Sequence, residues 1–281
     1  MMHNLREWWQ NLPLNMNPVF VQFGPVQIRY YGLMFLSAFL TFYFLMRYRI
    51  RRDKVILSAE QLDDYLVWAI AGALLGGRLG YVLFYDFFYF LKHPVQIFWP
   101  FHQANGQAYF GISGLSFHGG LLGVFLATFL FTKKRGLSLW QLGDAVVPAV
   151  PLGYTFGRLG NFFNGELYGR VTDVPWGMYF PADMGVVLRH PSQLYEAFFE
   201  GLVLFTIIWS VRNKRLFDGW LFWLYLTLYG TFRFFIEFVR QPDQQLGFVL
   251  GPLSMGQVLC LVMVGVGVFE IFRKRKVWRK T

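Results

Sequence analysis

Long apolar runs recur along the whole chain and are separated by short clusters of charged residues. A run of about 20 mostly apolar residues is long enough to cross a bilayer as a helix. The pattern predicts seven such helices, over Ile28–Arg47, Leu62–Tyr85, Leu115–Phe131, Leu139–Leu159, Ser192–Val211, Trp220–Phe238 and Leu253–Phe272. We therefore expect an all-α, polytopic membrane protein with about seven transmembrane helices.

The fourth apolar run differs from the others because prolines and glycines interrupt it. These are Pro148, Pro151, Gly153, Gly157 and Gly160. Breaks of this kind in a membrane helix are tolerated only where protein or a cavity covers the freed backbone groups. The sequence thus predicts an irregular fourth helix.

The composition supports a membrane protein. Hydrophobic residues make up 55% of the chain, aromatic residues 21% and charged residues only 15%, a balance that does not fit a soluble globular domain. The net charge of +10 is divided among clusters between the apolar runs, which is typical of membrane topology and does not indicate nucleic-acid binding. The single cysteine, Cys260, excludes an intrachain disulfide and a thiolate metal site.

Lysines and arginines gather after the first, third, fifth and seventh apolar runs. The clusters are Arg47–Lys54, Lys133–Arg135, Arg212–Arg215 and Arg273–Lys280. Basic residues are far fewer in the loops on the other side. Since cytoplasmic loops carry the excess of Lys and Arg, the N-terminus is predicted to lie outside and the C-terminus in the cytoplasm.

Ionisable side chains inside the apolar runs share one depth, the outer half of the membrane. With a rise of 1.5 Å per helical residue, Arg78 lies about 24 Å and Arg233 about 20 Å from the cytoplasmic ends of their helices. The same half is predicted to hold Tyr31, His118, Arg158 and Gln193. Such groups are rare in a bilayer core and usually mark function. Several arginines at one level favour an anion site, and a phospholipid phosphate in the outer leaflet is an anion found at that level.

Helical spacing suggests partners for these arginines. Tyr229, Arg233 and Glu237 are four residues apart and share a helix face, so Glu237 is expected to pair with Arg233. Glu196 and Glu200 also share a face, where they can serve as packing partners for the arginines.

Some of the candidate residues also have a purely structural interpretation. Arg78 either belongs to the anion site or pairs with Asp86 or a backbone carbonyl. His118 is either a reactive group or a packed, hydrogen-bonded histidine. Glu166 either takes part in the site or braces the loop after the fourth helix.

Motifs for other chemistries are missing from the sequence. It contains no phosphate-binding Gly-Lys-Ser/Thr loop, no His-Glu-x-x-His zinc helix and no Gly-x-Ser-x-Gly nucleophile turn. The residues alone leave three classes open: an enzyme, an outer-leaflet phospholipid or anion transporter, and a membrane receptor for signal peptides. A transporter is disfavoured because internal repeats, which are common in that class, are not evident.

Six sequence blocks resemble those of the prolipoprotein diacylglyceryl transferases. They are residues 30–34 (YYGLM), 75–81 (LGGRLGY), 116–120 (SFHGG), 157–170 (GRLGNFFNGELYGR), 189–196 (RHPSQLYE) and 232–243 (FRFFIEFVRQPD). The blocks follow the family's order across nearly the whole chain. Two departures concern loops: the segment between Gly169 and His190 is short for the family, and residues 101–113 are specific to this chain.

The resemblance implies a multi-pass transferase of the bacterial cytoplasmic (inner) membrane, with its active site toward the periplasm. Such an enzyme transfers the diacylglyceryl group of phosphatidylglycerol to the thiol of the lipobox cysteine in a prolipoprotein signal peptide. The products are a thioether and glycerol 1-phosphate, in the first step of lipoprotein maturation. Neither a cofactor nor a metal is expected. One catalytic domain spans residues 1–281, and the outer loops 86–114 and 162–191 are expected to form a small periplasmic head.

The resemblance also assigns roles to residues. The implied catalytic residues are His118 as general base, Arg158 as the group that binds phosphatidylglycerol, and Arg233 as a second essential arginine. The implied substrate-binding residues are Arg158, Tyr31, Asn161, Glu166, Gly169, Tyr229 and Glu237. The expected supporting residues are Arg78, His190, Gln193 and Glu196. The oligomeric state, the acyl-chain preference and the role of residues 101–113 stay open at this level.

Overall fold

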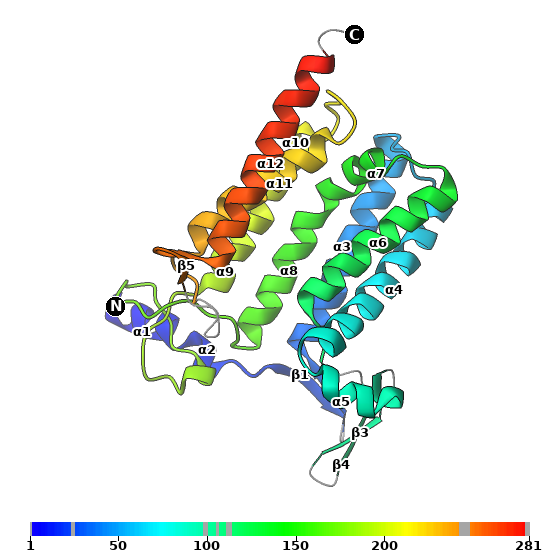
Figure 1. The fold of residues 1–281 in the computed structure, drawn as a ribbon. Coiled ribbons are helices and arrows are strands. Elements are labelled where there is room, and N and C mark those ends of the chain that lie inside the picture. Colours follow the sequence, from blue (N-terminus) through cyan, green and yellow to red (C-terminus); the bar gives the residue numbers. More distant parts are fainter. Residues whose placement is uncertain are drawn as a thin grey trace. The chain divides into compact units, whose positions relative to one another are not determined.

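The computed structural model describes residues 2–23, 26–97, 101–104, 107–110, 114–241 and 248–278. The chain forms two compact units, one made of residues 1–54 and 143–281 (unit 1) and the other of residues 55–142 (unit 2). Most of the described chain is helical, as the apolar runs predicted (Figure 1). Pro242 and Asp243 of the sixth sequence block lie outside the described residues.

Unit 2 is built on two long helices. Its elements are α4 (Ala59–Phe84), α5 (Phe87–Lys92), η1 (Pro94–Ile97), β3 (Phe101–Ala104), β4 (Gln107–Phe110) and α6 (Phe117–Arg135). Helix α4 begins with a capping box, in which the Ser58 hydroxyl accepts from the Gln61 N–H and the Gln61 side chain accepts from the Ser58 N–H. These bonds satisfy backbone donors that the first helical turn leaves without partners.

Glycines on α4 and α6 let the two helices touch through their backbones. A Cβ atom on Gly76 would collide with the backbone oxygen of Gly119, and one on Gly123 would collide with that of Gly72. The glycines recur every four residues along the contact, at Gly72, Gly76 and Gly80 on α4. Small residues at this spacing are typical of tightly packed membrane helices, in which van der Waals contact drives association.

Unit 1 contains the remaining helices. Its elements before the fourth apolar run are α1 (Met2–Gln10), α2 (Leu12–Asn15), β1 (Val19–Phe23), β2 (Val26–Arg29) and α3 (Tyr30–Arg52). Helix α7 (Leu139–Val146) begins in unit 2 and ends in unit 1. The elements of unit 1 after α7 are η2 (Val147–Ala149), α8 (Val150–Phe163), η3 (Pro181–Asp183), α9 (Ser192–Glu196), η4 (Ala197–Val203), α10 (Leu204–Val211), α11 (Trp220–Ile236), β5 (Phe248–Leu250), β6 (Leu253–Ser254) and α12 (Met255–Trp278).

Helix pairs in unit 1 pack side by side. Helix α3 lies against α8, and α11 lies against α12 (Figure 1). Gly153 of α8 faces the backbone of Ala38, and Gly230 of α11 faces the backbone of Cys260. Cys260 is buried in this second contact, which agrees with its apolar surroundings in the sequence. The α3–α8 pairing thus joins helices that are separated by about a hundred residues in sequence.

All seven predicted apolar runs are helical, with corrected ends. The first helix begins at Tyr30 because Ile28 and Arg29 belong to strand β2, and the last begins at Met255 because Leu253 and Ser254 form strand β6. The fourth run is irregular, as predicted: a 3₁₀ turn that contains Pro148 separates α7 from α8. The absence of a free N–H on proline explains this break.

The all-α prediction needs one further correction. The described residues include three antiparallel hairpins, β1–β2, β3–β4 and β5–β6. The first hairpin is rich in Val, Phe and Ile, which favour strands. Residues 101–113 form the segment that is specific to this chain. The structure describes the backbone of its hairpin β3–β4, and residues 105–106 and 111–113 lie outside the described residues.

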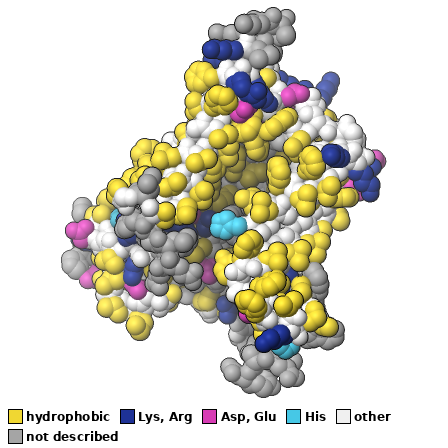
Figure 2. Space-filling view, in the orientation of Figure 1, with side chains coloured by type: hydrophobic (Ala, Val, Ile, Leu, Met, Phe, Trp, Pro, Cys, Tyr) yellow, Lys and Arg dark blue, Asp and Glu magenta, His cyan; other side chains and the backbone are white. Residues whose placement is uncertain are grey.

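Four helices in the described part of the chain are long and apolar enough to cross a membrane. They cover Tyr30–Arg52, Ala59–Phe84, Ser192–Val211 and Met255–Lys276. Large apolar side chains stay exposed along these helices, for example Phe44 (63% exposed) and Phe269 (63%). Hydrophobic side chains also cover much of the face in Figure 2. An apolar exterior of this kind is expected of helices that face lipid.

Candidate active site

A fully buried carboxylate, Glu196, lies at the centre of a cluster of arginines in unit 1. Its Oε2 atom is 2.9 Å from Nε of Arg158 and 3.3 Å from Nη1 of Arg233. Its Oε1 atom is 2.9 Å from Nη1 of Arg240. Glu196 is 0% exposed, whereas the side chain of each arginine stays 17–18% exposed. The three arginine side chains are thus partly exposed, whereas their shared counter-ion is fully buried.

Two further carboxylates complete the cluster. Nη2 of Arg233 is 3.0 Å from Oε2 of Glu237, and Nη1 of Arg233 is 3.8 Å from Oε1 of Glu200. The pairing of Arg233 with Glu237 that the sequence predicted is thus confirmed. Glu237 also accepts a hydrogen bond of 3.0 Å from the Ser254 hydroxyl. Burial of several charges is tolerated when they are paired and hydrogen-bonded in this way.

A π-helical segment positions the carboxylates. The chain is π-helical over η4, directly after Glu196, and Glu200 lies within it. Gly201 of η4 packs so closely on Thr155 of α8 that a Cβ atom would collide with the threonine hydroxyl. That hydroxyl donates to the Ala197 carbonyl at 3.4 Å. Single π-turns are frequent at functional sites, and this one brings both carboxylates toward α8.

Tyr154 links the carboxylates to Arg158. Its hydroxyl donates to Glu200 Oε2 and, at 3.3 Å, to Glu196 Oε2. The Arg158 guanidinium carbon lies 4.8 Å from the centre of the Tyr154 ring, which is a cation–π distance. Tyr229 meets the Tyr154 ring edge to face at 6.1 Å, so it lies in the same cluster.

A second line of contacts runs from Arg158 to the loop after α8. Arg158 donates to the Asn161 side-chain oxygen at 3.3 Å, and Asn161 donates to Glu166 at 2.8 Å. The buried Gln193 donates to the Glu166 carbonyl at 2.7 Å. Tyr31 packs beside this line, with its ring against Gly160. Four of the predicted site residues, Arg158, Asn161, Glu166 and Gln193, are therefore connected.

Gly169 and His190 lie beside this cluster on the loop side. The Gly169 N–H donates to the His190 carbonyl at 2.8 Å, and a side chain on Gly169 would collide with the Val239 carbonyl. His190 is within 3.2 Å of the Tyr195 hydroxyl through Nδ1. Burial lowers the pKa of His190, and the negative charge of Asp173 partly opposes that shift. His190 also lines an apolar cavity of about 540 Å³ together with Phe199 and Phe232.

Two of the predicted residues belong to unit 2. Arg78 is 2% exposed and donates to the carbonyls of Gln96 and Gly114 at 2.8 and 3.3 Å. Its guanidinium carbon also lies 4.8 Å from the centre of the Phe90 ring. Arg78 thus pairs with backbone carbonyls, as the structural interpretation expects, and its supporting role in the site stays a prediction. His118 is the second residue of α6 and is exposed, and its role stays a prediction.

Three members of the cluster were missed or ranked too low from sequence. Glu196 was expected only to support the site, although it contacts three arginines. Arg240, in the sixth sequence block, and Tyr154 are not among the residues that the sequence predicts for the site. Tyr154 does lie four residues before Arg158 on one helix face, which is a signal that the sequence offered.

Comparisons with known proteins agree on one family. Residues 18–273 match the family model described as prolipoprotein diacylglyceryl transferase. The chain is 55% identical over 262 residues to the phosphatidylglycerol–prolipoprotein diacylglyceryl transferase of Chlorobaculum tepidum, covering 93% of this chain and 91% of that protein. Proteins with the same name from Aliarcobacter butzleri and Geobacter sulfurreducens are 47% and 44% identical, and each alignment covers at least 94% of this chain and 98% of the relative.

Proposed function

Since the chain belongs to the prolipoprotein diacylglyceryl transferase family, we propose that it is the transferase that modifies bacterial prolipoproteins. It takes the diacylglyceryl group from phosphatidylglycerol and attaches it to the lipobox cysteine thiol. The observation that carries the proposal, beyond family membership, is the pair of partly exposed arginines held on the buried Glu196. This arrangement suits a substrate that presents one phosphate.

We propose seven membrane crossings. Besides the four apolar helices, the other three are α6, the broken helix α7–α8, and α11. The positive-inside pattern puts the N-terminus in the periplasm and the C-terminus in the cytoplasm. The enzyme then lies in the inner membrane as one catalytic domain with its active site toward the periplasm, and loops 86–114 and 162–191 form a small head there.

Arg158 and Arg233 hold the phosphate in this proposal. When the glycerol C3–O bond breaks, the departing glycerol 1-phosphate gains a negative charge. Guanidinium groups that Glu196 already holds in place stabilise the growing charge with little reorganisation. Because this interaction is stronger in the transition state than in the bound lipid, it increases the rate as well as the affinity.

Glu196 acts through the arginines and is a positioning residue. One carboxylate shared by three cations keeps their guanidinium groups from repelling one another. Tyr154 and Glu237 constrain the same groups from two sides. The other predicted substrate-binding residues surround this centre in unit 1: Tyr31, Asn161, Glu166, Gly169 and Tyr229. His190 and Gln193 support the adjoining loop.

The acceptor must react as a thiolate, because the thiol itself is a poor nucleophile. The thiolate sulfur attacks C3 of the glycerol, a C–S bond forms, and the C–O bond to the phosphate breaks. We propose that His118 takes the thiol proton, as an imidazole titrates near neutral pH. This assignment rests on the resemblance of residues 116–120 to the family and on the chemistry of imidazole.

Purified Arg158→Ala and Arg233→Ala enzymes, supplied with phosphatidylglycerol and a lipobox peptide, test the proposal. Each should lose at least about 100-fold in transfer rate, because each removes a charged hydrogen-bond donor from the transition state. Arg273→Ala, which removes an exposed arginine, is the control and should transfer normally. Full turnover by either site variant contradicts the assignment.

The same assay separates the enzyme from the alternative, a phospholipid transporter. Release of glycerol phosphate in step with peptide lipidation supports the transferase, whereas lipid movement without release supports the transporter. His118→Gln keeps a hydrogen-bonding group but cannot accept the proton. An unchanged rate across the pH range in this variant would show that another group is the base.

A further inference from the structure

Five cations and one carboxylate line a cavity at the C-terminal ends of α3 and α10. The cavity has a volume of about 300 Å³. Its charged lining consists of Arg49, Arg52, Asp53, Lys54, Arg212 and Arg215. All six residues belong to unit 1. We call this cavity the basic pocket.

The only carboxylate in the lining is already shared. Oδ2 of Asp53 is 3.1 Å from Nε of Arg49 and 3.1 Å from Nε of Arg212. In the part of the chain that the structure describes, no carboxylate lies within ion-pair distance of Arg52, Lys54 or Arg215. The basic pocket therefore keeps three uncompensated cations around one concave surface.

The backbone at Lys54 adopts a conformation that favours glycine. Its φ angle is +49°, in the left-handed region, directly after the C-terminal end of α3. Glycine is the usual residue at this position because it lacks the Cβ atom that makes the conformation unfavourable. Lys54 therefore brings a positive charge to the lining of the pocket in a backbone conformation that is unfavourable for a residue with a Cβ atom.

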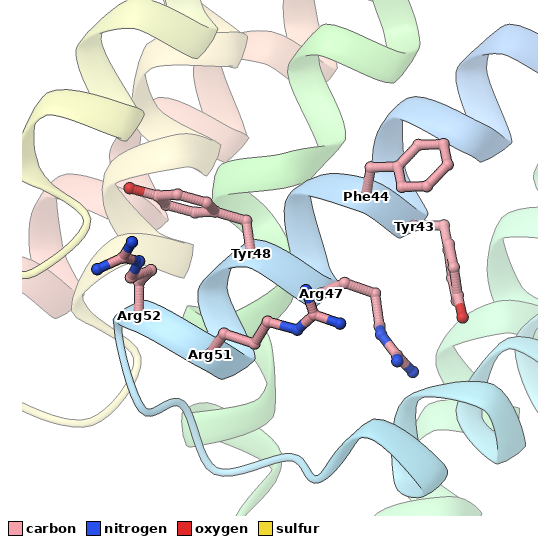
Figure 3. Close-up of a pocket in the computed structure, with 6 residues that line it drawn as sticks. All are labelled: Tyr43, Phe44, Arg47, Tyr48, Arg51 and Arg52. Atoms are coloured by element: carbon pink, nitrogen blue, oxygen red, sulfur yellow. The ribbon is translucent and has the colours of Figure 1, made fainter.

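An aromatic groove continues from the basic pocket along α3. Arg52 also lines a second cavity of about 540 Å³, whose other lining residues are Tyr43, Phe44, Arg47, Tyr48 and Arg51. Figure 3 shows Arg51 extending toward Arg47, and Arg52 on the side of Tyr48. Phe44 is 63% exposed and Tyr48 is 45% exposed. Cations beside exposed aromatic rings are typical of the membrane–water interface.

We propose that the basic pocket binds the phosphate of an anionic phospholipid, with the acyl chains along the exposed face of α3. Arginine pairs with phosphate through two parallel hydrogen bonds, so the uncompensated guanidinium groups suit that ligand. The groove of Tyr43, Phe44 and Tyr48 favours an amphiphile over a soluble phosphate, since it adds apolar surface next to the charge. The assignment of this site to the cytoplasmic leaflet rests on the topology in the proposed function.

Phosphatidylserine is a suitable probe, because phosphatidylglycerol is the proposed substrate of the Glu196 site. The full chain is reconstituted in phosphatidylcholine nanodiscs with increasing phosphatidylserine, and bound lipids are counted by native mass spectrometry. The variant Arg52→Gln/Lys54→Gly/Arg215→Gln removes the uncompensated cations and relaxes the backbone at residue 54. It should lose one bound phosphatidylserine and bind about 100-fold more weakly at this site, at roughly a factor of five per cation.

The matched control, Arg273→Gln/Arg275→Gln/Lys276→Gln, removes the same charge from the end of α12. It should keep the wild-type lipid count. Equal retention by the pocket variant overturns the proposal, and so does equal loss in the control, which would show general surface attraction only. Displacement of the lipid by inorganic phosphate at concentrations similar to the lipid's would show that the occupant is a soluble phosphate.

Transfer activity toward phosphatidylglycerol in detergent is measured on the same samples. The pocket variant should retain it, which demonstrates that the variant is folded. Loss of phosphatidylserine binding with retained transfer therefore tests the basic pocket alone, and loss of transfer in Arg158→Ala tests the proposed function alone.

Discussion

Arg158 and Arg233 contact the same carboxylate oxygen, Oε2 of Glu196, at 2.9 and 3.3 Å. The first arginine comes from α8 and the second from α11, and Glu196 lies at the end of α9 between them in sequence. Two guanidinium groups repel one another at close range unless an anion lies between them. The buried carboxylate thus holds both cations close together, as the proposed phosphate site requires.

Glu196→Gln should strongly destabilise the protein. The amide keeps the size of the side chain but removes the counter-ion of three arginines. Loss of one partner from a buried ionic cluster costs about 3–5 kcal/mol. Thermal unfolding in detergent measures the effect. Glu270→Gln, at the partly exposed pair with Arg273, is the control and should unfold close to the wild-type temperature. Similar unfolding temperatures for the two variants would contradict the central role of Glu196.

Tyr154→Phe should reduce transfer while the protein stays folded. The ring remains next to Arg158, but the hydroxyl that donates to Glu196 and Glu200 is removed. A hydrogen bond to a charged group contributes about 1.5–3 kcal/mol, so kcat/KM should fall by roughly 10- to 100-fold.

The matched control for that measurement is Tyr225→Phe. Tyr225 stacks on Tyr229 at 5.9 Å, and among the described residues its hydroxyl makes no hydrogen bond. Its removal should leave kcat/KM within about twofold of wild type. An equal loss in both variants would mean that the hydroxyl contacts of Tyr154 are not specific.

Gly123→Ala should loosen unit 2. The added methyl group would collide with the backbone of Gly72, and backbone cannot move aside as a flexible side chain can. Overpacking of this kind costs about 1–3 kcal/mol. Gly120→Ala, on the same helix, is the control because its nearest neighbour would be 3.4 Å away. The Gly123 variant should unfold at the lower temperature, and the opposite order would contradict the close approach of α4 and α6.

Stability should depend on pH through His190. Burial lowers its pKa in the folded state, so the unfolded chain takes up the proton more readily. The stability gained from neutral His190 is therefore complete above the ordinary histidine pKa of about 6.5 and is lost as the pH falls below it. Unfolding temperatures between pH 7.5 and 5.5 should decrease more for the wild type than for His190→Gln. Parallel decreases in the two proteins would exclude this contribution.

Local patterns in the sequence were sufficient for most helices. Hydrophobicity over about 20 residues is a property of the segment itself, and lipid replaces most tertiary contacts on its outer face. The helix starts at Tyr30 and Met255 were less predictable. Each directly follows a short hairpin, and a strand ends where its partner strand no longer supplies backbone hydrogen bonds. The break at Pro148 was predictable, since proline acts on its own turn.

The sequence by itself identified Arg158, Arg233 and Glu237, because charged groups within apolar runs are costly and therefore conspicuous. Only the tertiary structure decided that Glu196 is the common partner of Arg158 and Arg233 and that Arg240 and Tyr154 join it. Those contacts depend on the packing of α8 against η4 and on the π-helical turn, which set the side-chain directions of residues far apart in sequence. The residue type determines whether a side chain is charged. Which charged side chains pair depends on the distances between them, and the folded chain sets those distances.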